Sequence, residues 1–276
     1  MPEFLDLLPP DEALHRFFDA LPQSRLKTEK IYTAEALGRV SAADVLAPEG
    51  LPGFDRSTVD GYAMSAADTF GASDSLPAFM QVIGEVAMGC APIFRLERGQ
   101  AAMIHTGGML PAGADAVVML EHTQQAREHE IEVLRAVGVS ENVLKKGEDV
   151  QEGEIVVLAG SILRPAEIGG LLALGITEID VACRPVVGVL SSGDEVVPPE
   201  SALHPGQVRD VNSYSLAALI EGKGGQARRY GILPDQAEAL EYSLKSALVE
   251  CDAVVVTAGS SASSRDLTAQ VIRRMG

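Results

Sequence analysis

The carboxyl-terminal third of the chain alternates strand-like and helix-like segments, and this alternation restricts the possible folds more than any other feature. Residues 186–190 are an uninterrupted apolar run, typical of a strand buried on both faces. Further apolar runs follow at 230–233 and 253–256. Strands that alternate with helices at this spacing form a parallel, doubly wound α/β sheet with right-handed connections.

The segments between these runs have the spacing and end signals of helices. Apolar side chains recur at helical intervals over 212–220, where Asn212 is the expected cap and Gly222 the stop. A second helix is predicted over 235–248, because Asp235 and Glu238 resemble a capping box. Residues 267–275 are expected to form a third.

Ligands of doubly wound sheets bind at the carboxyl ends of the strands. Two polar segments stand at such ends here, SSGDE at 191–195 and TAGSSASSRD at 257–266. Asp194 and Glu195 are suited to hold Mg²⁺, a cation that takes oxygen ligands, although Asp194 is an equally good helix cap. The second segment offers hydroxyls, amides, a cation and a carboxylate, which suit an oxyanion such as phosphate. The alternative for it is a flexible serine-rich loop.

The rest of the chain divides into helical ends and a β-rich middle. Amphipathic spacing predicts helices over 11–21 and 165–174 and a short one over 33–37. Between 48 and 146, short apolar runs separated by Gly and Pro predict the strands of a small β-domain. These runs cover residues 81–86, 101–104, 116–120 and 131–134.

The formal charge of −17 argues against nucleic acid and anionic membranes as partners. An anionic substrate would need local cations or amides. The sequence lacks the roughly 20 continuous apolar residues of a membrane span, and the amino end has no secretory pattern. Cys90, Cys183 and Cys251 are widely spaced, which predicts reduced, buried thiols in a cytosolic protein.

Three segments of the middle region carry candidate functional groups, each with a simpler alternative. Residues 51–64, LPGFDRSTVDGYAM, bring Asp55 and Asp60 together, although an Asp-Gly pair is usually only a turn. Residues 106–108, Thr-Gly-Gly, offer amides and a hydroxyl to an oxyanion, or form an ordinary glycine turn. Residues 145–149 are a mixed-charge patch that elsewhere would be a solvated loop. His105 stands beside Thr106, where it is placed to contact a ligand, although an ordinary hydrogen-bonded histidine is the favoured alternative. The five histidines lack zinc-protease spacing.

Five segments in the same order resemble the molybdenum insertases, the family that includes the bacterial MoeA proteins and the E domain of gephyrin. Residues 51–64 are similar to the family signature D-x-S-x-x-D-G-Y-A. The other matching segments are IHTGGMLPAGADAVV at 104–118, KGEDV at 146–150, AGSILRP at 159–165 and VLSSGDEV at 189–196. The resemblance runs from about residue 32 to the last residue.

The resemblance implies molybdenum insertion into adenylylated molybdopterin, with molybdate as the second substrate and AMP released, a late step of molybdenum-cofactor biosynthesis. It further implies Mg²⁺, a cytoplasmic location and a homodimer whose site is shared between subunits. The residues it assigns to catalysis are Asp60, Thr106, Asp149, Glu195, Asp235 and Asp266. The residues it assigns to substrate binding are Gly107, Ser192, Gly193, Asp194, Gly259, Ser261 and Ser263, and the expected metal ligands are Glu195 and Asp266.

The same resemblance implies an α/β protein of three domains. An elongated α+β linker and dimerisation domain covers 1–47 and 146–180, and a small β-rich domain covers 48–145. A doubly wound, three-layer α/β/α molybdopterin-binding domain covers 181–276. Three strands make a narrow sheet, so this last domain is expected to be incomplete and the chain to be part of a longer protein.

The chain departs from the family pattern at two places. Segment 257–266 has one glycine and is one residue shorter than usual, which leaves open the serine of 260–264 that faces the ligand. Arg56 stands where the family often has Asn. These departures give weight to an alternative function, a non-catalytic scaffold or pterin-binding module of the same fold. A nucleotidyl transferase acting on the pterin is a third possibility, against which the amino-terminal motifs argue.

Overall fold

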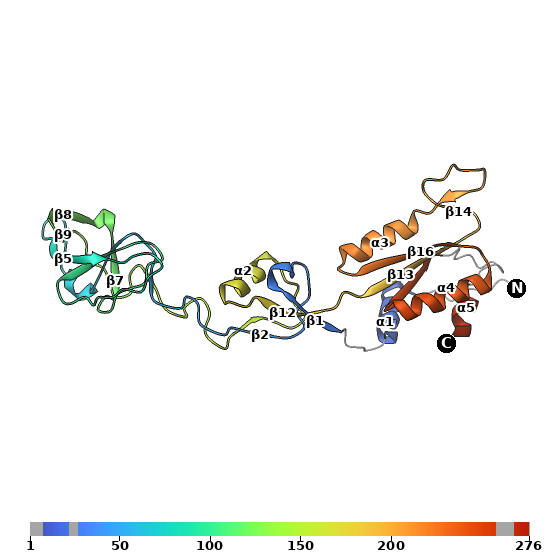
Figure 1. The fold of residues 1–276 in the computed structure, drawn as a ribbon, viewed down its shortest axis with the longest axis horizontal. Helices are drawn as coiled ribbons and strands as arrows, with labels where there is room; N and C mark the ends of the chain where they lie inside the picture. The colour runs from blue at the N-terminus through green and yellow to red at the C-terminus, as the bar shows by residue number, and fades with distance from the viewer. Residues whose placement is uncertain (1–7, 22–26, 258–267, 276) are drawn as a thin grey trace. The chain divides into compact units, whose positions relative to one another are not determined.

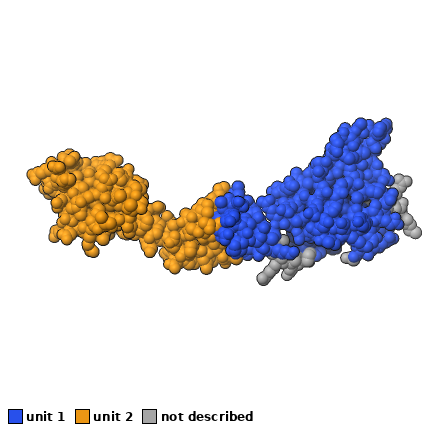
Figure 2. Space-filling model, in the orientation of Figure 1, with its two compact units in different colours: residues 1–42, 162–164, 178–276 blue, residues 43–161, 165–177 orange. Residues whose placement is uncertain are grey.

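The computed structural model describes residues 8–21, 27–257 and 268–275 and shows mixed α/β content. The chain forms two compact units, coloured separately in Figure 2. The parallel-sheet unit comprises residues 1–42, 162–164 and 178–276, and the mixed-sheet unit comprises residues 43–161 and 165–177. Each unit is described by itself. The three-domain division stays a prediction.

The parallel-sheet unit contains the alternating strands and helices expected from the sequence (Figure 1). Its elements are α1 Pro10–Ala20, β1 Thr28–Tyr32, η1 Thr33–Glu35, β12 Glu178–Ala182, β13 Val186–Ser192, β14 Val196–Val197, β15 Val208–Arg209, α3 Asn212–Gly222, β16 Gln226–Leu233, α4 Ala237–Glu250, β17 Ala253–Thr257 and α5 Thr268–Met275.

Strands β16, β13 and β17 form a parallel sheet in that order, as the alternation predicts. The chain leaves β13 toward β16 on one side and returns to β17 on the other, so the order reverses between β13 and β17. Helix α3 packs against β16 and β13. Leu190 of β13 joins a core with Leu240 and Leu244 of α4 and Val271 of α5, and Figure 1 draws these helices on the side of the sheet away from α3.

Both predicted helix caps of this unit are wrong. The residue at the cap position of α3 is Val211, not Asn212. The amide and hydroxyl of Ser213, in the first turn, donate to the carboxylate of Asp210, 3.1 and 2.6 Å away, so Asp210 satisfies a free amide at the start of the helix. No side-chain cap hydrogen bond is found at the start of α4. Asp235, the expected cap there, accepts a hydrogen bond from Ser192. The hydrogen bonds of Asp210 and Asp235 therefore differ from the helix caps that the sequence spacing predicts.

The mixed-sheet unit contains many short strands. Its elements are β2 Val45–Leu46, β3 Arg56–Ser57, β4 Gly61–Met64, η2 Ala66–Thr69, β5 Ala78–Glu85, β6 Gln100–Ile104, β7 Ala116–Met119, η3 Leu120–His122, β8 Thr123–Arg127, β9 Glu130–Val133, β10 Val143–Leu144, β11 Ile155–Val157 and α2 Pro165–Ala173. Six strands form one sheet in the order β7-β4-β6-β5-β9-β8, in which only β5 and β6 run parallel. The strands predicted from apolar runs are β5, β6, β7 and β9.

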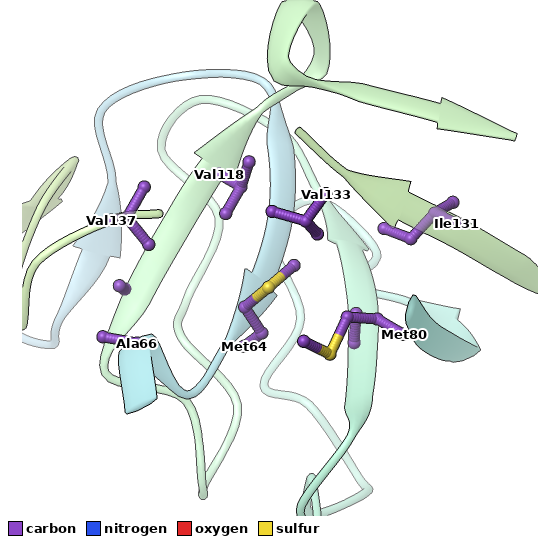
Figure 3. Packing of buried hydrophobic residues seen from close by; sticks show 9 residues of the cluster. Met64, Ala66, Met80, Val118, Ile131, Val133 and Val137 are labelled. Carbon is purple, nitrogen blue, oxygen red and sulfur yellow. The ribbon is translucent and has the colours of Figure 1, made fainter. Parts of the chain in front are cut away.

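Strands β4, β6 and β7 of this sheet are largely buried on both faces. Successive residues of one strand point to opposite faces. Accordingly Ala63 and Met64 of β4 belong to different hydrophobic clusters, as do Val117 and Val118 of β7. Figure 3 shows the cluster around Met64, with Met80, Val118, Ile131 and Val133 around it. The flexible thioether side chains of Met64 and Met80 fill the irregular space that small residues leave.

Two further predictions concern membrane-spanning helices and the burial of the cysteines. None of the described helices has the length and apolar character needed to span a membrane. All three cysteines are free, but the prediction that they are buried is wrong. Cys90 is exposed, and Cys183 and Cys251 are half-buried.

Candidate functional site

In the mixed-sheet unit, the first candidate cluster is built by two turns that flank strands β4 and β6. Asp60 directly precedes β4, and Thr106 follows β6, which pairs with β4 in antiparallel register. The amide and hydroxyl of Thr106 donate to Oδ1 of Asp60 over 2.8 and 3.3 Å. The structure thus brings together two of the residues predicted for catalysis.

The predicted oxyanion site at residues 106–108 is wrong in one respect, because internal acceptors already occupy its amides. The Thr106 amide donates to Asp60, the Gly107 amide to the carbonyl of Ser57, and the Gly108 amide to the carbonyl of His105. The oxyanion in this turn is therefore the protein's own Asp60 carboxylate. The Thr106 amide is the main cause that lowers the pKa of Asp60 below its usual value, and His105 adds to the effect.

His105 and Glu85 extend this cluster, although neither was among the residues expected to act in catalysis. His105 Nε2 lies 3.1 Å from a carboxylate oxygen of Glu85, and Nδ1 lies 3.6 Å from Oδ1 of Asp60. Glu85 belongs to β5, which pairs with β6. No motif marks Glu85, so only the strand register places it beside His105.

Asp55, the other carboxylate of the motif, is held by the mixed-charge patch. Its oxygens accept hydrogen bonds from Nζ of Lys145 at 2.9 Å and from the amide of Lys146 at 2.8 Å. The Lys146 amide is the largest cause that lowers the pKa of Asp55, with Lys145 adding to it. Residues 145–149 are therefore ordered by hydrogen bonds to Asp55 and are more than a solvated loop.

Asp149, predicted for catalysis, lies in the same turn region. Its amide donates to the carbonyl of Leu51, which ties residues 145–150 to the start of the motif segment. Its side chain belongs to an exposed residue. The structure therefore anchors the backbone at Asp149 and leaves its carboxylate accessible.

The second candidate cluster lies at the carboxyl ends of β13 and β16 in the parallel-sheet unit. The Ser192 hydroxyl donates to Oδ1 of Asp235 over 2.6 Å, and the amide of Asp235 donates to Oδ1 of Asp194 over 3.2 Å. Asp194 caps no helix, because strand β14 follows it. Three of the predicted residues are thus linked in one hydrogen-bonded chain.

Gly193 and Glu195 complete the described part of this cluster. Gly193 has a φ of 151°, and a Cβ placed there would lie 2.9 Å from Glu195 Oε2. The Gly193 amide donates to the carbonyl of Leu233 at the end of β16. Glycine therefore allows the Glu195 side chain to fold back over the turn, beside the ends of the strands.

Residues at the end of β17 continue the polar edge toward the point where the strand order reverses. The Thr257 hydroxyl lies 3.1 Å from the Ser191 hydroxyl on β13. Doubly wound sheets bind ligands at this position. The four remaining predicted residues, Gly259, Ser261, Ser263 and Asp266, lie outside the described residues.

The described side chains limit how a metal ion can be bound. They contain no group of three or more His, Cys, Asp or Glu that is arranged to hold one. Mg²⁺ usually keeps several water ligands and is held by one or two carboxylates together with substrate phosphates. The exposed Asp194, Glu195 and Asp235 fit a hydrated Mg²⁺ of that kind. They do not fit an ion enclosed by protein ligands alone.

The fold is that of an α/β protein with an acidic candidate cluster at the carboxyl edge of the parallel sheet in one unit. The other unit carries a separate candidate cluster, in which a Thr-Gly-Gly turn holds a carboxylate. Residues 8–175 match the "MoeA N-terminal region (domain I and II)". Residues 188–276 match the "Probable molybdopterin binding domain". The chain belongs to the MoeA family.

Curated relatives and solved structures are similar over most of the chain. A molybdopterin molybdenumtransferase of Nostoc is 34% identical over 94% of this chain and 60% of its own length. One of Haemophilus influenzae is 32% identical over 96% of this chain and 64% of its own length. The crystal structure of the molybdopterin biosynthesis MoeA protein of Pyrococcus horikoshii is 37% identical, with a TM-score of 0.85 over 91% of this chain and 66% of that one. This chain thus spans about three fifths of the length of these curated relatives.

Proposed function

We propose that the protein inserts molybdenum from molybdate into adenylylated molybdopterin and releases AMP. The observation that carries the proposal is family membership combined with the geometry of the matching motifs. Asp60 is fixed by Thr106, and Asp235 is fixed by Ser192. Two hydrogen-bonded carboxylates in the two motif regions are what a site needs if acidic groups orient water and molybdate.

We infer that Mg²⁺ supports this reaction, with Glu195 and Asp266 as its protein ligands. Bound Mg²⁺ would reverse the local charge and allow an acidic protein to hold phosphate and molybdate. Ser192 would keep the Asp235 carboxylate fixed at the edge of the sheet. We further propose a cytoplasmic homodimer in which Asp60 and Thr106 of one subunit face Glu195 and Asp266 of the other. A two-fold axis generates two equivalent sites of this kind.

AMP release tests the proposal. The protein is incubated with adenylylated molybdopterin in the presence and absence of molybdate and Mg²⁺. AMP production that requires both additions supports insertion. Binding of the pterin without AMP production contradicts it and favours the non-catalytic alternative. Asp235→Asn is expected to reduce AMP production strongly, and Asp252→Asn on the amino-terminal side of β17 serves as the control.

A further inference from the structure

The imidazole of His105 lies between two carboxylates that come from different parts of the mixed sheet. Its Nε2 is 3.1 Å from Glu85 at the end of β5, and its Nδ1 is 3.6 Å from Asp60 before β4. Side-chain exposure is 39% for His105, 57% for Asp60 and 58% for Glu85, so all three groups can reach solvent or a ligand. A neutral imidazole donates through one nitrogen only, whereas the imidazolium donates to both carboxylates.

The contacts of Asp60 are concentrated on one of its two oxygens. The Thr106 amide, the Thr106 hydroxyl and His105 Nδ1 all approach Oδ1. Two hydrogen bonds from Thr106 and a neighbouring imidazole nitrogen at 3.6 Å restrict the orientation of the carboxylate. Oδ2 is then the oxygen that Asp60 presents to other molecules, and its direction depends on the residues that hold Oδ1.

We propose that His105 is a positioning residue for Asp60, which ties the Asp60 carboxylate to Glu85 and so directs Oδ2 toward the substrate. The Thr106 amide donates to Oδ1 over 2.8 Å, and His105 Nδ1 lies 3.6 Å from the same oxygen while its Nε2 lies 3.1 Å from Glu85. Rotation of the Asp60 carboxylate therefore disturbs both contacts. The effect on the reaction rests on the proposed function, whereas the effect on Asp60 itself does not.

A simpler explanation is an ordinary surface ion pair between His105 and Glu85. Exposed pairs of this kind contribute little to stability and need not influence a third residue. The two explanations differ in what happens to the hydrogen bond between Thr106 and Asp60 when the histidine is replaced. Positioning requires that this hydrogen bond weaken, and a surface pair leaves it unchanged.

The experiment measures hydrogen exchange of the Thr106 amide by NMR in four proteins. In His105→Asn the amide nitrogen takes the place of Nδ1 and can still donate to Asp60. In His105→Gln it takes the place of Nε2 and can reach only Glu85. His122→Gln is the matched control, because His122 lies in the same unit beside Arg135. We expect exchange to be several-fold faster in His105→Gln. In His105→Asn, which keeps the contact with Asp60 but loses the contact with Glu85, exchange should be less accelerated, and in His122→Gln it should stay close to wild type.

Two outcomes overturn the proposal: equal Thr106 exchange in wild type and His105→Gln, or equal acceleration in both His105 variants. AMP release provides the second readout. His105→Gln is expected to lower kcat about tenfold with KM for the adenylylated pterin unchanged, because a misdirected catalytic group slows the chemical step rather than binding. If the wild type releases no AMP, the proposed function fails, and the exchange result still decides whether His105 positions Asp60.

Discussion

At the scale of single residues, Gly61 shows why the Asp-Gly pair of the motif is not a turn. Gly61 belongs to strand β4, and a Cβ added to it would lie 2.0 Å from the carbonyl oxygen of Val118 on β7. The glycine is therefore required by the close approach of two strands. Because Asp60 directly precedes Gly61, the same packing also fixes the backbone position of Asp60.

We predict that Gly61→Ala separates β4 from β7 and destabilises the mixed-sheet unit. Overpacking of this kind costs about 1–3 kcal/mol, and more where backbone atoms collide. Gly53→Ala is the control, since no atom lies within 4 Å of a Cβ placed there, and its effect should stay within about 0.5 kcal/mol. Denaturant unfolding measures both variants. Equal stability of the two would show that β7 does not pass Gly61 as described.

The hydrogen bonds that Lys145 and Lys146 donate to Asp55 predict that stability depends on pH. Because its pKa is lowered from the usual 3.8, the ionised carboxylate stabilises the folded state at pH values above 3.8, and this contribution disappears as the pH falls through the lowered value. Asp55→Asn should therefore be less stable than wild type at pH 5–7, by no more than about 1 kcal/mol, because the pair is partly exposed. The difference should shrink below pH 3.8. A stability difference between wild type and Asp55→Asn that grows in acid would contradict a stabilising role of these hydrogen bonds.

At the scale of secondary structure elements, the start of α3 depends on Asp210 rather than on Asn212. Asp210 is buried, with 6% exposure, and accepts the amide and hydroxyl hydrogens of Ser213. We predict that Asp210→Ala destabilises the parallel-sheet unit by about 0.5–2 kcal/mol, the usual range for loss of a cap. Asn212→Ala should have little effect. If Asn212→Ala lowers the midpoint of thermal unfolding more than Asp210→Ala does, the helix start depends on Asn212, as the sequence predicts.

The two-faced core of the mixed sheet predicts unequal effects for two methionines. Met64 is fully buried between strands, whereas Met88 is 57% exposed. Met64→Ala should cost about 2–5 kcal/mol, since it removes buried contacts and leaves a cavity. Met88→Ala should change stability by less than about 0.5 kcal/mol. Hydrogen exchange of the β4 amides reports the loss locally, and equal protection in both variants would argue against the described core.

Sequence patterns predicted the elements that bury long apolar runs and missed those held by pairing alone. Strands β13, β16 and β17 and helix α4 are recognisable because their core residues repeat at the period of the element. Strand β1, Thr28–Tyr32, was not predicted. It is mostly exposed, and its partner β12 lies about 150 residues away, so nothing local indicates the pairing.

At the scale of the whole molecule, the proposed function requires a chain with a formal charge of −17 to bind anionic substrates. The two candidate clusters use carboxylates held by hydrogen bonds rather than an array of basic side chains. This chemistry suits an anion that arrives with Mg²⁺, because the ion supplies the positive charge that the protein lacks. The same negative charge repels the phosphates of nucleic acid, so nucleic acid is not an expected partner.

The candidate site was predictable in part. The family resemblance assigned Asp60, Thr106, Ser192 and Asp235 to the site, and the structure shows that these residues are hydrogen bonded in two pairs. His105 and Glu85 were not assigned, because their relation depends on the register of β5 against β6. The occupied amides at residues 106–108 were also not predicted, since a Thr-Gly-Gly sequence does not show which acceptor its amides find.

The most direct test of the proposed shared site combines two inactive variants. Asp60→Asn and Glu195→Gln should each lose AMP release when expressed alone. If a site uses Asp60 of one subunit and Glu195 of the other, random mixing makes half of the dimers heterodimers, each with one intact site. Co-expression should then restore about one quarter of wild-type AMP release. Co-expressed protein no more active than either variant alone would contradict a site built from both subunits.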